Sequence, residues 1–436
     1  MGAAPVAVRR SPRRSEAIAS AAPRADADVL ETEGRWAALA VVSTGTLLAL
    51  APWFSASAVT PLLAADWHPS GLQLTFLAIA VQLGFAAGAL TLAATGVVDV
   101  VPGRWLFPVG AIVAGAANLA FAFLATDPGS ALPFRFLTGA GIAAVYPVAL
   151  KHLAGWFRAG RGLAIGILIG AITVGSALPY LVRAAGATSD LDWRAIVAAT
   201  SVLAVAGGLL VGAFGRAGPL ETPATRFSPR IAATAFRSGS VRLATLGYRG
   251  HMWELYAMWT WVPAFIAASF AVAGTTDPST SSLAAFAVVA AGGVGCIGAG
   301  AMADRLGRTT LTIAAMAISG ASAIAIGFFF GAPPALLLTV AIIWGITVVA
   351  DSAQFSAAVS ELAPPGTAGS ALSVQLAVGF VLTGVTILGI GLIGPNDATA
   401  WRLAFASLAL GPIVGIIAMW HLRSRSDAPK MAGGHR

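Results

Sequence analysis

Long apolar runs, separated by short polar or Gly/Pro-marked breaks, recur along almost the whole chain. Because a hydrocarbon core about 30 Å thick needs about 20 apolar residues per helix, each run can cross a membrane. The pattern predicts twelve spans, at 36–60, 72–97, 105–126, 132–153, 162–185, 195–214, 243–270, 283–303, 311–331, 336–359, 370–393 and 403–420. The runs lack the ten-residue alternation of an outer-membrane barrel, so we expect an all-α membrane protein.

One long polar connection, residues 215–242, divides six spans from six. We interpret it as a cytoplasmic linker between an N-terminal six-helix bundle, 36–214, and a C-terminal six-helix bundle, 243–422. The Arg/Ala/Pro-rich residues 1–35 are expected to form a disordered cytoplasmic tail, and residues 423–436 a second cytoplasmic tail.

The two halves share features at a nearly constant spacing of 205 to 208 residues. The matched positions are Trp193-Arg194 with Trp401-Arg402, Asp99 with Asp304, Gly139 with Gly345, and Trp53 with Trp261. A six-helix unit repeated in parallel is the arrangement of two-domain alternating-access transporters. Composition bias in Gly-, Ala- and Trp-rich helices is the alternative explanation.

Composition and charge agree with a membrane protein and set its orientation. The chain is 57% hydrophobic and 10% charged, with a mean hydropathy of +0.83. Placing both termini in the cytoplasm leaves only four of the 26 Lys and Arg residues toward the outside, namely Arg135, Arg183, Arg194 and Arg402. The positive-inside rule favours this multi-pass orientation in a cytoplasmic membrane. The basic residues then face lipid headgroups, which excludes a nucleic-acid partner.

Few residues suit catalysis or metal binding. Cys296 is the single cysteine, the five histidines are scattered, and no P-loop motif is present to use ATP. We therefore expect no enzyme activity, no metal and no cofactor, and we expect a gradient to drive any transport.

The loop after the eighth predicted span, "GAGAMADRLGRTT", contains Gly300, Asp304, Arg305, Gly307 and Arg308. It resembles the signature loop of the major facilitator superfamily, in which glycines permit a tight turn and charged residues close the cytoplasmic side. The resemblance extends over about residues 35 to 425. It implies two pseudo-symmetric six-helix bundles and transport of a small molecule.

Other segments match the superfamily less fully. The first-half loop keeps Asp99 and Arg104 with wider spacing, and Arg135 with Gly139 resembles the arginine pattern of the fourth helix, which implies proton coupling or anion binding for Arg135. Snorkelling of Arg135 is the alternative. The fifth span lacks the Gly-Pro pair of drug exporters. The first loop and "GSALP" in the fifth span resemble the cyanate-permease-type branch.

The seventh predicted span carries polar residues near the membrane midplane. At 1.5 Å per residue from Leu243, Glu254 lies about 17 Å into the span. His251, Glu254, Met258 and Trp261 share one helix face, which we expect to line a central cavity where Glu254 changes charge. A fixed ion pair of Glu254 with Arg249 or His251 is the alternative.

The remaining candidates fall into three groups. Asp351 joins Glu254, His251 and Arg135 as a proton-coupling candidate, with a structural pair to a loop cation as the alternative for Asp351. The cavity candidates are Trp53, Phe54, Tyr146, Tyr256, Met258, Trp261 and Gln375. The cytoplasmic-gate candidates are Asp99, Arg104, Gly300, Asp304, Arg305, Gly307, Arg308 and Glu361.

These features predict a monomeric secondary transporter with protons as the coupling ion. Arg135, Arg249 and His251 favour a small anion or polar organic acid as its substrate. A proton antiporter that exports drugs or metabolites is the alternative, and a non-transporting receptor on the same fold is a third possibility.

Overall fold

The protein is described by a computed structural model that covers Gly2 and residues 34–157, 160–189, 191–220 and 227–435. The expected tail at 1–35 lies almost entirely outside the described residues. The described chain is helical and has no strand. The first half contains α2 (Arg35–Ala49), α3 (Ser55–Ala58), α4 (Thr60–Trp67), α5 (Gly71–Thr95), α6 (Val97–Val100), α7 (Gly103–Leu124), α8 (Pro128–Ile142), α9 (Tyr146–Ala154), α10 (Arg161–Ala187) and α11 (Trp193–Phe214).

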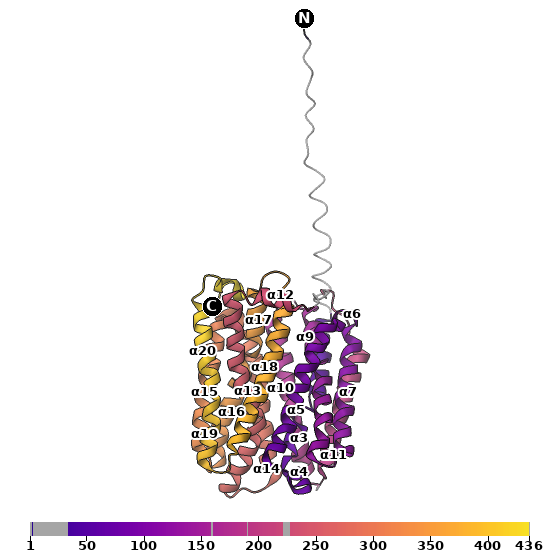
Figure 1. Ribbon diagram of the computed structural model, residues 1–436, viewed down its shortest axis with the longest axis vertical. Coiled ribbons are helices and arrows are strands. Elements are labelled where there is room, and N and C mark those ends of the chain that lie inside the picture. The colour runs from indigo at the N-terminus through magenta and orange to yellow at the C-terminus, as the bar shows by residue number, and fades with distance from the viewer. Residues whose placement is uncertain (1, 3–33, 158–159, 190, 221–226, 436) are drawn as a thin grey trace.

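The second half begins with a short helix and continues as a second bundle. Its elements are α12 (Pro229–Ala235), α13 (Gly239–Val272), α14 (Pro278–Leu306), α15 (Arg308–Ile326), η1 (Gly327–Phe329), α16 (Pro334–Ala350), α17 (Ser352–Leu362), α18 (Ala368–Ile393), α19 (Ala398–Leu408), α20 (Leu410–Arg423) and η2 (Ala428–Gly434). We refer to α2–α11 as the N-half and α13–α20 as the C-half. The two halves stand side by side (Figure 1).

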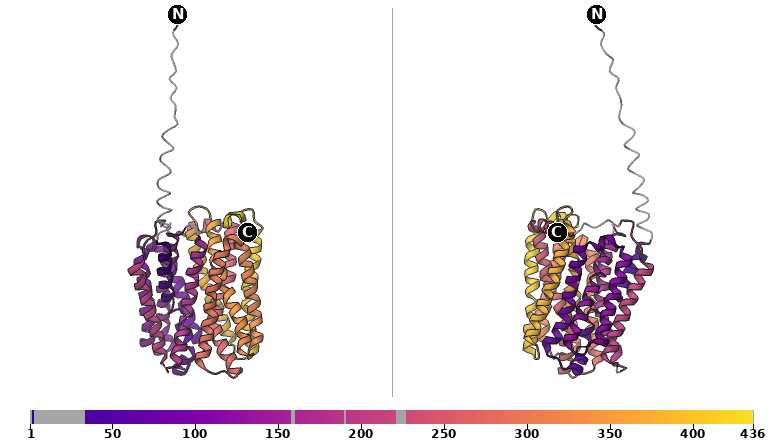
Figure 2. Two further views of the ribbon diagram at one scale, coloured as in Figure 1. Left: turned by 180° about the vertical axis from the view of Figure 1, so that it is seen from behind. Right: turned by 45° about the vertical axis from the view of Figure 1, so that its right-hand side comes forward.

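Eleven continuous or gently broken helices in the described chain are long and apolar enough to cross a membrane. The first predicted span completes the set as a broken rod of α2, α3 and α4. The expected all-α membrane protein in two six-helix halves is confirmed. Helix α2 begins at the end of the bundle that also holds α6, α12 and η2, and we call this end the α12 end. The opposite end, which holds α4, is called the α4 end (Figures 1 and 2).

Proline positions explain why two of the predicted spans are broken. Pro61 and Pro147 lie in the first turns of α4 and α9, where a missing N–H costs nothing, and each follows a break in its span. The first span therefore bends at 50–54 and continues to Trp67, beyond its predicted end at residue 60. The breaks bring backbone carbonyls into the bundle interior, where side chains must satisfy them.

Two predicted polar segments contain ordered structure. The described part of the predicted linker, 215–242, includes α12, and α13 already begins at Gly239. In the predicted tail, η2 packs against the C-half with Ala428 and Met431 fully buried. A few apolar residues within each polar segment allow this packing. The mean hydropathy of the segments did not indicate it.

Matched glycines show that the two halves repeat one packing arrangement. A Cβ on Gly139 of α8 would lie 2.0 Å from the Val81 carbonyl oxygen of α5. A Cβ on Gly345 of α16 would lie 2.0 Å from the Val288 carbonyl oxygen of α14. The fourth helix of each half therefore touches the second at an equivalent glycine, as the sequence repeat predicts.

Two pairs of helices join the halves. On one side α10 packs along α14, where Gly162 and Gly166 face Gly300 and Cys296 at close range. On the other side α5 packs against α18, and Thr75 and Ile79 meet Gly391 and Gly384 toward the α4 end. The region between the halves is the seam in which a substrate path can lie.

Candidate functional site

Two cavities open in the seam on the α12 side of the molecule. One, of about 350 Å³, lies among α5, α9, α13 and α18, and the other, of about 480 Å³, lies among α9, α10, α17 and the α14–α15 turn. Tyr146 and Lys151 of α9 line both cavities. A smaller space of about 40 Å³ extends deeper and is also lined by Tyr146.

An aromatic layer forms part of the wall of the deep space. Trp53, at the break of the first span, has ring centroids of Phe85, Tyr256 and Phe380 within 5.1, 5.5 and 5.7 Å. Phe54 packs against Tyr256 and Trp259. Both halves contribute to this layer. Because α5 runs from the α4 end toward the α12 end, Phe85 lies deeper than Ala89 and Leu92, so the layer separates the cavities from the α4 end.

Helix α13 presents two distinct faces. Tyr248, Met252, Leu255 and Trp259, spaced at helical intervals, line the deep space. The face with His251 and Glu254, which we expected to line the cavity, lies inside the C-half instead. The interior of a helix bundle offers hydrogen-bond donors to a carboxylate, which the sequence pattern of a single helix does not reveal.

Met258 and Trp261 share that inward face. Met258 is fully buried in the core of the C-half. The indole N–H of Trp261 donates to the Ile387 carbonyl at 3.3 Å, and its ring packs against Trp401. Neither residue lines the cavities described above, which corrects the expected cavity face of this helix.

Glu254 is held by two neighbouring helices of its own half. Trp344 Nε1 of α16 donates to Oε1 at 2.7 Å, and Ser319 Oγ of α15 donates to Oε2 at 2.9 Å. Glu254 is only 2% exposed. The alternative of a pair with Arg249 or His251 is not what the structure shows, because Arg249 is exposed and His251 binds another carboxylate.

His251 and Asp351 form a buried pair. His251 Nδ1 lies 2.8 Å from Asp351 Oδ1, and both side chains are 2% exposed or less. His251 Nε2 has no hydrogen-bond partner among the described residues. The imidazole lies beside Tyr248, with ring centroids 6.1 Å apart, and Ser352, next to Asp351, lines the deep space. The pair therefore sits directly behind the cavity wall.

Arg135 is fully buried in the N-half, which excludes the snorkelling alternative. Its Nη1 donates to the Pro52 carbonyl, Ser55 Oγ and Asn118 Oδ1 at 3.1, 3.0 and 2.8 Å, and Nη2 donates to the Trp53 carbonyl at 2.7 Å. The guanidinium satisfies backbone groups that the break of the first span leaves unpaired. Arg135 thereby fixes the segment that carries Trp53 and Phe54.

The gate candidates meet at the α12 end of the C-half. Arg308 Nη2 lies 3.3 Å from Asp304 Oδ1 and 2.9 Å from Glu361 Oε1, and Nη1 donates to Gln354 Oε1 at 2.7 Å. A Cβ on Gly162 would lie 3.4 Å from Asp304 Oδ2. The Asp304 carboxylate thus faces the first turn of α10 in the other half, where the positive end of the helix dipole favours a negative charge.

Other gate candidates take no part in these contacts. Arg305 is exposed, and Arg104 is exposed with its guanidinium over the Trp105 ring. The side chain of Asp99 lies outside the described residues. Gly300 packs closely on α10, and Gly307 makes the turn between α14 and α15 with a φ of 86° that glycine adopts without strain.

The sequence indicated some cavity residues and missed others. Trp53, Tyr146 and Tyr256 line the deep space and Gln375 lines the 350 Å³ cavity, whereas Phe54 contributes only to the aromatic layer. Lys151, Tyr248, Phe85 and Phe380 were not singled out. Lys151 had been counted only as a cytoplasmic charge; its position one turn beyond Tyr146 and Pro147 on a broken helix was the available signal.

Comparison with known proteins agrees with this architecture. The profile of the Major Facilitator Superfamily matches residues 42–387. A structure of the xylose transporter XylE from E. coli, in a partially occluded inward-open conformation, is similar with a TM-score of 0.70 at 14% identity, over 89% of this chain and 97% of that one. A structure of the proton:xylose symporter XylE bound to 6-bromo-6-deoxy-D-glucose has a TM-score of 0.71 at 14% identity, over 90% and 96%. No curated protein matches the chain.

The fold and the seam cavities define a multi-pass membrane transporter rather than an enzyme. The chain belongs to the Major Facilitator Superfamily. The comparisons support the superfamily and do not extend to the cyanate-permease-type branch.

Proposed function

We propose that this protein is a proton-coupled secondary transporter that moves a small organic acid through the seam by alternating access. The observation that carries the proposal is the buried His251–Asp351 pair behind a cavity wall that both halves build. Uptake of one proton from the cavity side would convert an Asp351 carboxylate beside a neutral His251 into an ion pair, and release of that proton would return the pair to a net charge of minus one. Rocking of the halves about the seam changes the hydration of the wall and hence the cost of each form.

The lining of the 350 Å³ cavity supports this choice of substrate class. Among its described lining residues, Lys151 is the only charged one, and most of the others are apolar. The Lys151 ammonium donates to the Val98 carbonyl at 2.7 Å, which places it at the cavity wall. An acid with an apolar body suits this lining better than a sugar, which would need many hydrogen-bond partners. Arg135 and Arg249, which first favoured an anion, lie away from the cavities.

Glu254 and Arg135 have different roles in this proposal. Glu254 fixes α13 against α15 and α16 and sets the field around the His251–Asp351 pair, and Arg135 positions the first-span break. The α12 end is the cytoplasmic end of a cytoplasmic membrane, so the open cavities face inward. The unit is the monomer. A place in the cyanate-permease-type branch stays a prediction from the first loop and "GSALP".

The test is transport in proteoliposomes with an imposed pH gradient. We expect wild-type protein to accumulate a small organic acid when the gradient is present, with proton movement reported by an enclosed pH dye. His251→Gln and Asp351→Asn should lose gradient-driven accumulation and retain downhill exchange. Undiminished accumulation by both variants would remove the pair from coupling.

The export alternative is distinguished by the direction of proton movement. A symporter carries protons in the same direction as substrate, whereas an antiporter exchanges them. The aromatic layer of Trp53, Phe85, Tyr256 and Phe380 is the observation that favours an apolar cargo in the export case. Alkalinisation of the compartment that receives substrate would support the exporter.

A further inference from the structure

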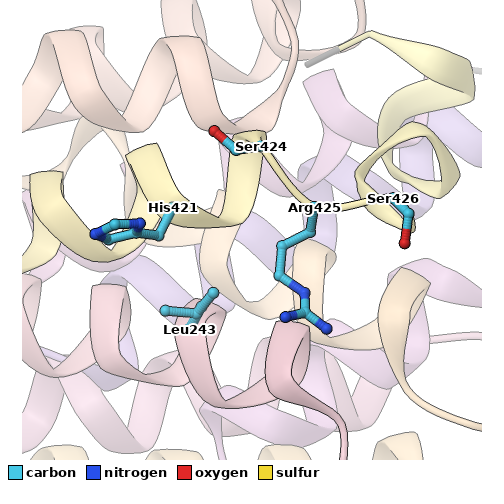
Figure 3. Close-up of a pocket in the computed structure, with 5 residues that line it drawn as sticks. All are labelled: Leu243, His421, Ser424, Arg425 and Ser426. Atoms are coloured by element: carbon cyan, nitrogen blue, oxygen red, sulfur yellow. The ribbon is translucent and has the colours of Figure 1, made fainter.

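A pocket on the periphery of the C-half has no place in the transport path. It has a volume of about 550 Å³ and lies at the α12 end, where Leu243 of α13 faces the last turn of α20. Figure 3 shows the lining residues: His421 and Ser424 project from α20, and Arg425 reaches across toward the start of α13. Helices of one half alone form this pocket, so rocking of the two halves does not open or close it.

The outward face of α20 places the pocket at the level of lipid headgroups. Leu410, Ile413 and Ile417 are 56%, 50% and 53% exposed, and they recur along one helix face. Trp420, 62% exposed, continues this apolar strip at the position where aromatic residues mark the membrane interface. His421 follows directly. Acyl chains can therefore pack along this strip between the hydrocarbon core and the pocket.

Arg425 is oriented by contacts that leave part of its guanidinium available. Its Nε donates to Ser240 Oγ at 3.1 Å, and Asp427 Oδ1 lies 3.7 Å from the same nitrogen. A Cβ on Gly239 would lie 3.2 Å from the guanidinium carbon and both Nη atoms. In the described part of the chain, neither Nη atom makes a hydrogen bond to another residue. The planar group therefore lies over the first residue of α13 and keeps donors for an anion.

Two further cations lie on the exposed face of α13, outside the pocket lining, and Arg242 Nη1 donates to the Phe236 and Arg237 carbonyls at 3.0 and 3.3 Å. Arg242, Leu246 and Arg249 are all exposed and recur every three or four residues. The same face carries Trp253, whose indole N–H donates to the Ser407 carbonyl in α19 at 3.1 Å, so it borders the α19–α20 rod. The arginine stems can cover apolar surface while their charged groups reach the headgroup layer. The positive end of the α13 dipole adds to this field.

We propose that this pocket binds an anionic glycerophospholipid. Its phosphate lies between Arg425, His421 and the hydroxyl group of Ser426, and its acyl chains follow the exposed strip of α20. Arg242 and Arg249 supply the surrounding positive field, whereas Asp427 orients Arg425. Basic pockets beside membrane-spanning helices at the cytoplasmic side are a recurrent form of lipid recognition.

The experiment measures the thermal unfolding midpoint of the full-length protein in detergent during titration with phosphatidylglycerol or phosphatidylcholine. We expect phosphatidylglycerol to stabilise the wild type at lower concentration. Arg425→Gln should raise the half-saturating concentration about fivefold, and Arg242→Gln combined with Arg425→Gln should raise it about 25-fold, on the scale of about 1 kcal/mol per cation. Arg425→Lys keeps the charge and should stay within about twofold of wild type.

Lys430→Gln is the matched control, because Lys430 is an exposed cation at the same end outside the pocket. An equal loss in this control would mean nonspecific surface attraction and overturn the proposal. An equal loss in Arg425→Lys and Arg425→Gln would mean a purely structural role and overturn it as well. Full competition by inorganic phosphate would assign the pocket to a free anion instead of a lipid. Unchanged titration of Arg425→Gln would also reject the site.

Discussion

Trp344 and Glu254 are joined by a 2.7 Å hydrogen bond between two buried side chains of the C-half, on α16 and α13. With the bond from Ser319, it ties three helices together at one carboxyl group. The N-half has a matching feature, because Arg135 joins the fourth helix to the first and third through Pro52, Trp53 and Asn118. Each half thus has a polar centre that joins three of its membrane-spanning helices, as the proposed alternating access would require.

Loss of the Glu254 carboxyl should destabilise the C-half. We expect Glu254→Ala to lower the free energy of unfolding by about 1–3 kcal/mol, because the Trp344 N–H stays buried without an acceptor. Glu254→Gln keeps an acceptor of the same shape and should cost less than half as much. Thermal melts in detergent measure both, and equal stability of the Ala variant would contradict the assigned role.

Arg135 should act through the shape of the first-span break. Arg135→Lys keeps the charge but cannot donate to Pro52, Trp53 and Asn118 together, since an ammonium lacks the planar fork. We expect at least tenfold slower transport and a lower unfolding midpoint. The difference in tryptophan fluorescence between this protein and the same protein with Trp53→Phe reports the displaced segment. A slow variant with unchanged Trp53 fluorescence would argue for direct coupling by Arg135 instead.

The matched glycines of the two halves should respond alike to substitution by alanine. A methyl group on Gly139 or Gly345 would meet a carbonyl oxygen at 2.0 Å, so alanine at either position should cost about 1–3 kcal/mol of stability. Gly298→Ala is the control, because a Cβ there has no atom within 4 Å and the helix gains propensity. If only one of the matched variants is destabilised, the packing of the halves is not equivalent.

The C-terminal segment should stabilise the contact between Arg308 and Glu361. The Ala432 N–H donates to Glu361 Oε2 at 3.2 Å, and the same carboxylate binds Arg308. Met431→Asp should release η2 by placing a charge at a fully buried position, whereas Met431→Leu should be tolerated. Faster amide hydrogen exchange of residues 428–434 measures the release of η2. The second measurement is faster chemical modification of a cysteine introduced at Ala357, which lines the 480 Å³ cavity.

Low pH should weaken the start of α8. The side chain of Ser130, with the backbone N–H groups of Ser130 and Gly129, holds the pKa of Asp127 below its usual value. Because the folded-state pKa is depressed, the contribution of this cap is present above the unfolded-state pKa and is lost as pH falls through the folded-state value. Asp127→Ala should therefore speed amide exchange at 129–130 at pH 7 and have little effect near pH 2. A pH-independent difference would contradict the cap assignment.

The sequence by itself determined the membrane-spanning helices, their division into two related halves, and the charged turn around Asp304 and Arg308. These features depend on local hydropathy and on short motifs, so they can be recognised without knowledge of neighbouring helices. The contact of Arg308 with Glu361 also follows from charge complementarity at one end of the bundle.

Only the tertiary structure decided which face of α13 meets the seam. Both of its faces are apolar enough for a core, and a polar residue can be satisfied by a cavity or by donors on another helix. The indole of Trp344 and the hydroxyl of Ser319 satisfy Glu254 inside the C-half, so Tyr248, Tyr256 and Trp259 face the cavity. Partners supplied by residues 65 and 90 positions away leave no trace in the periodicity of the helix.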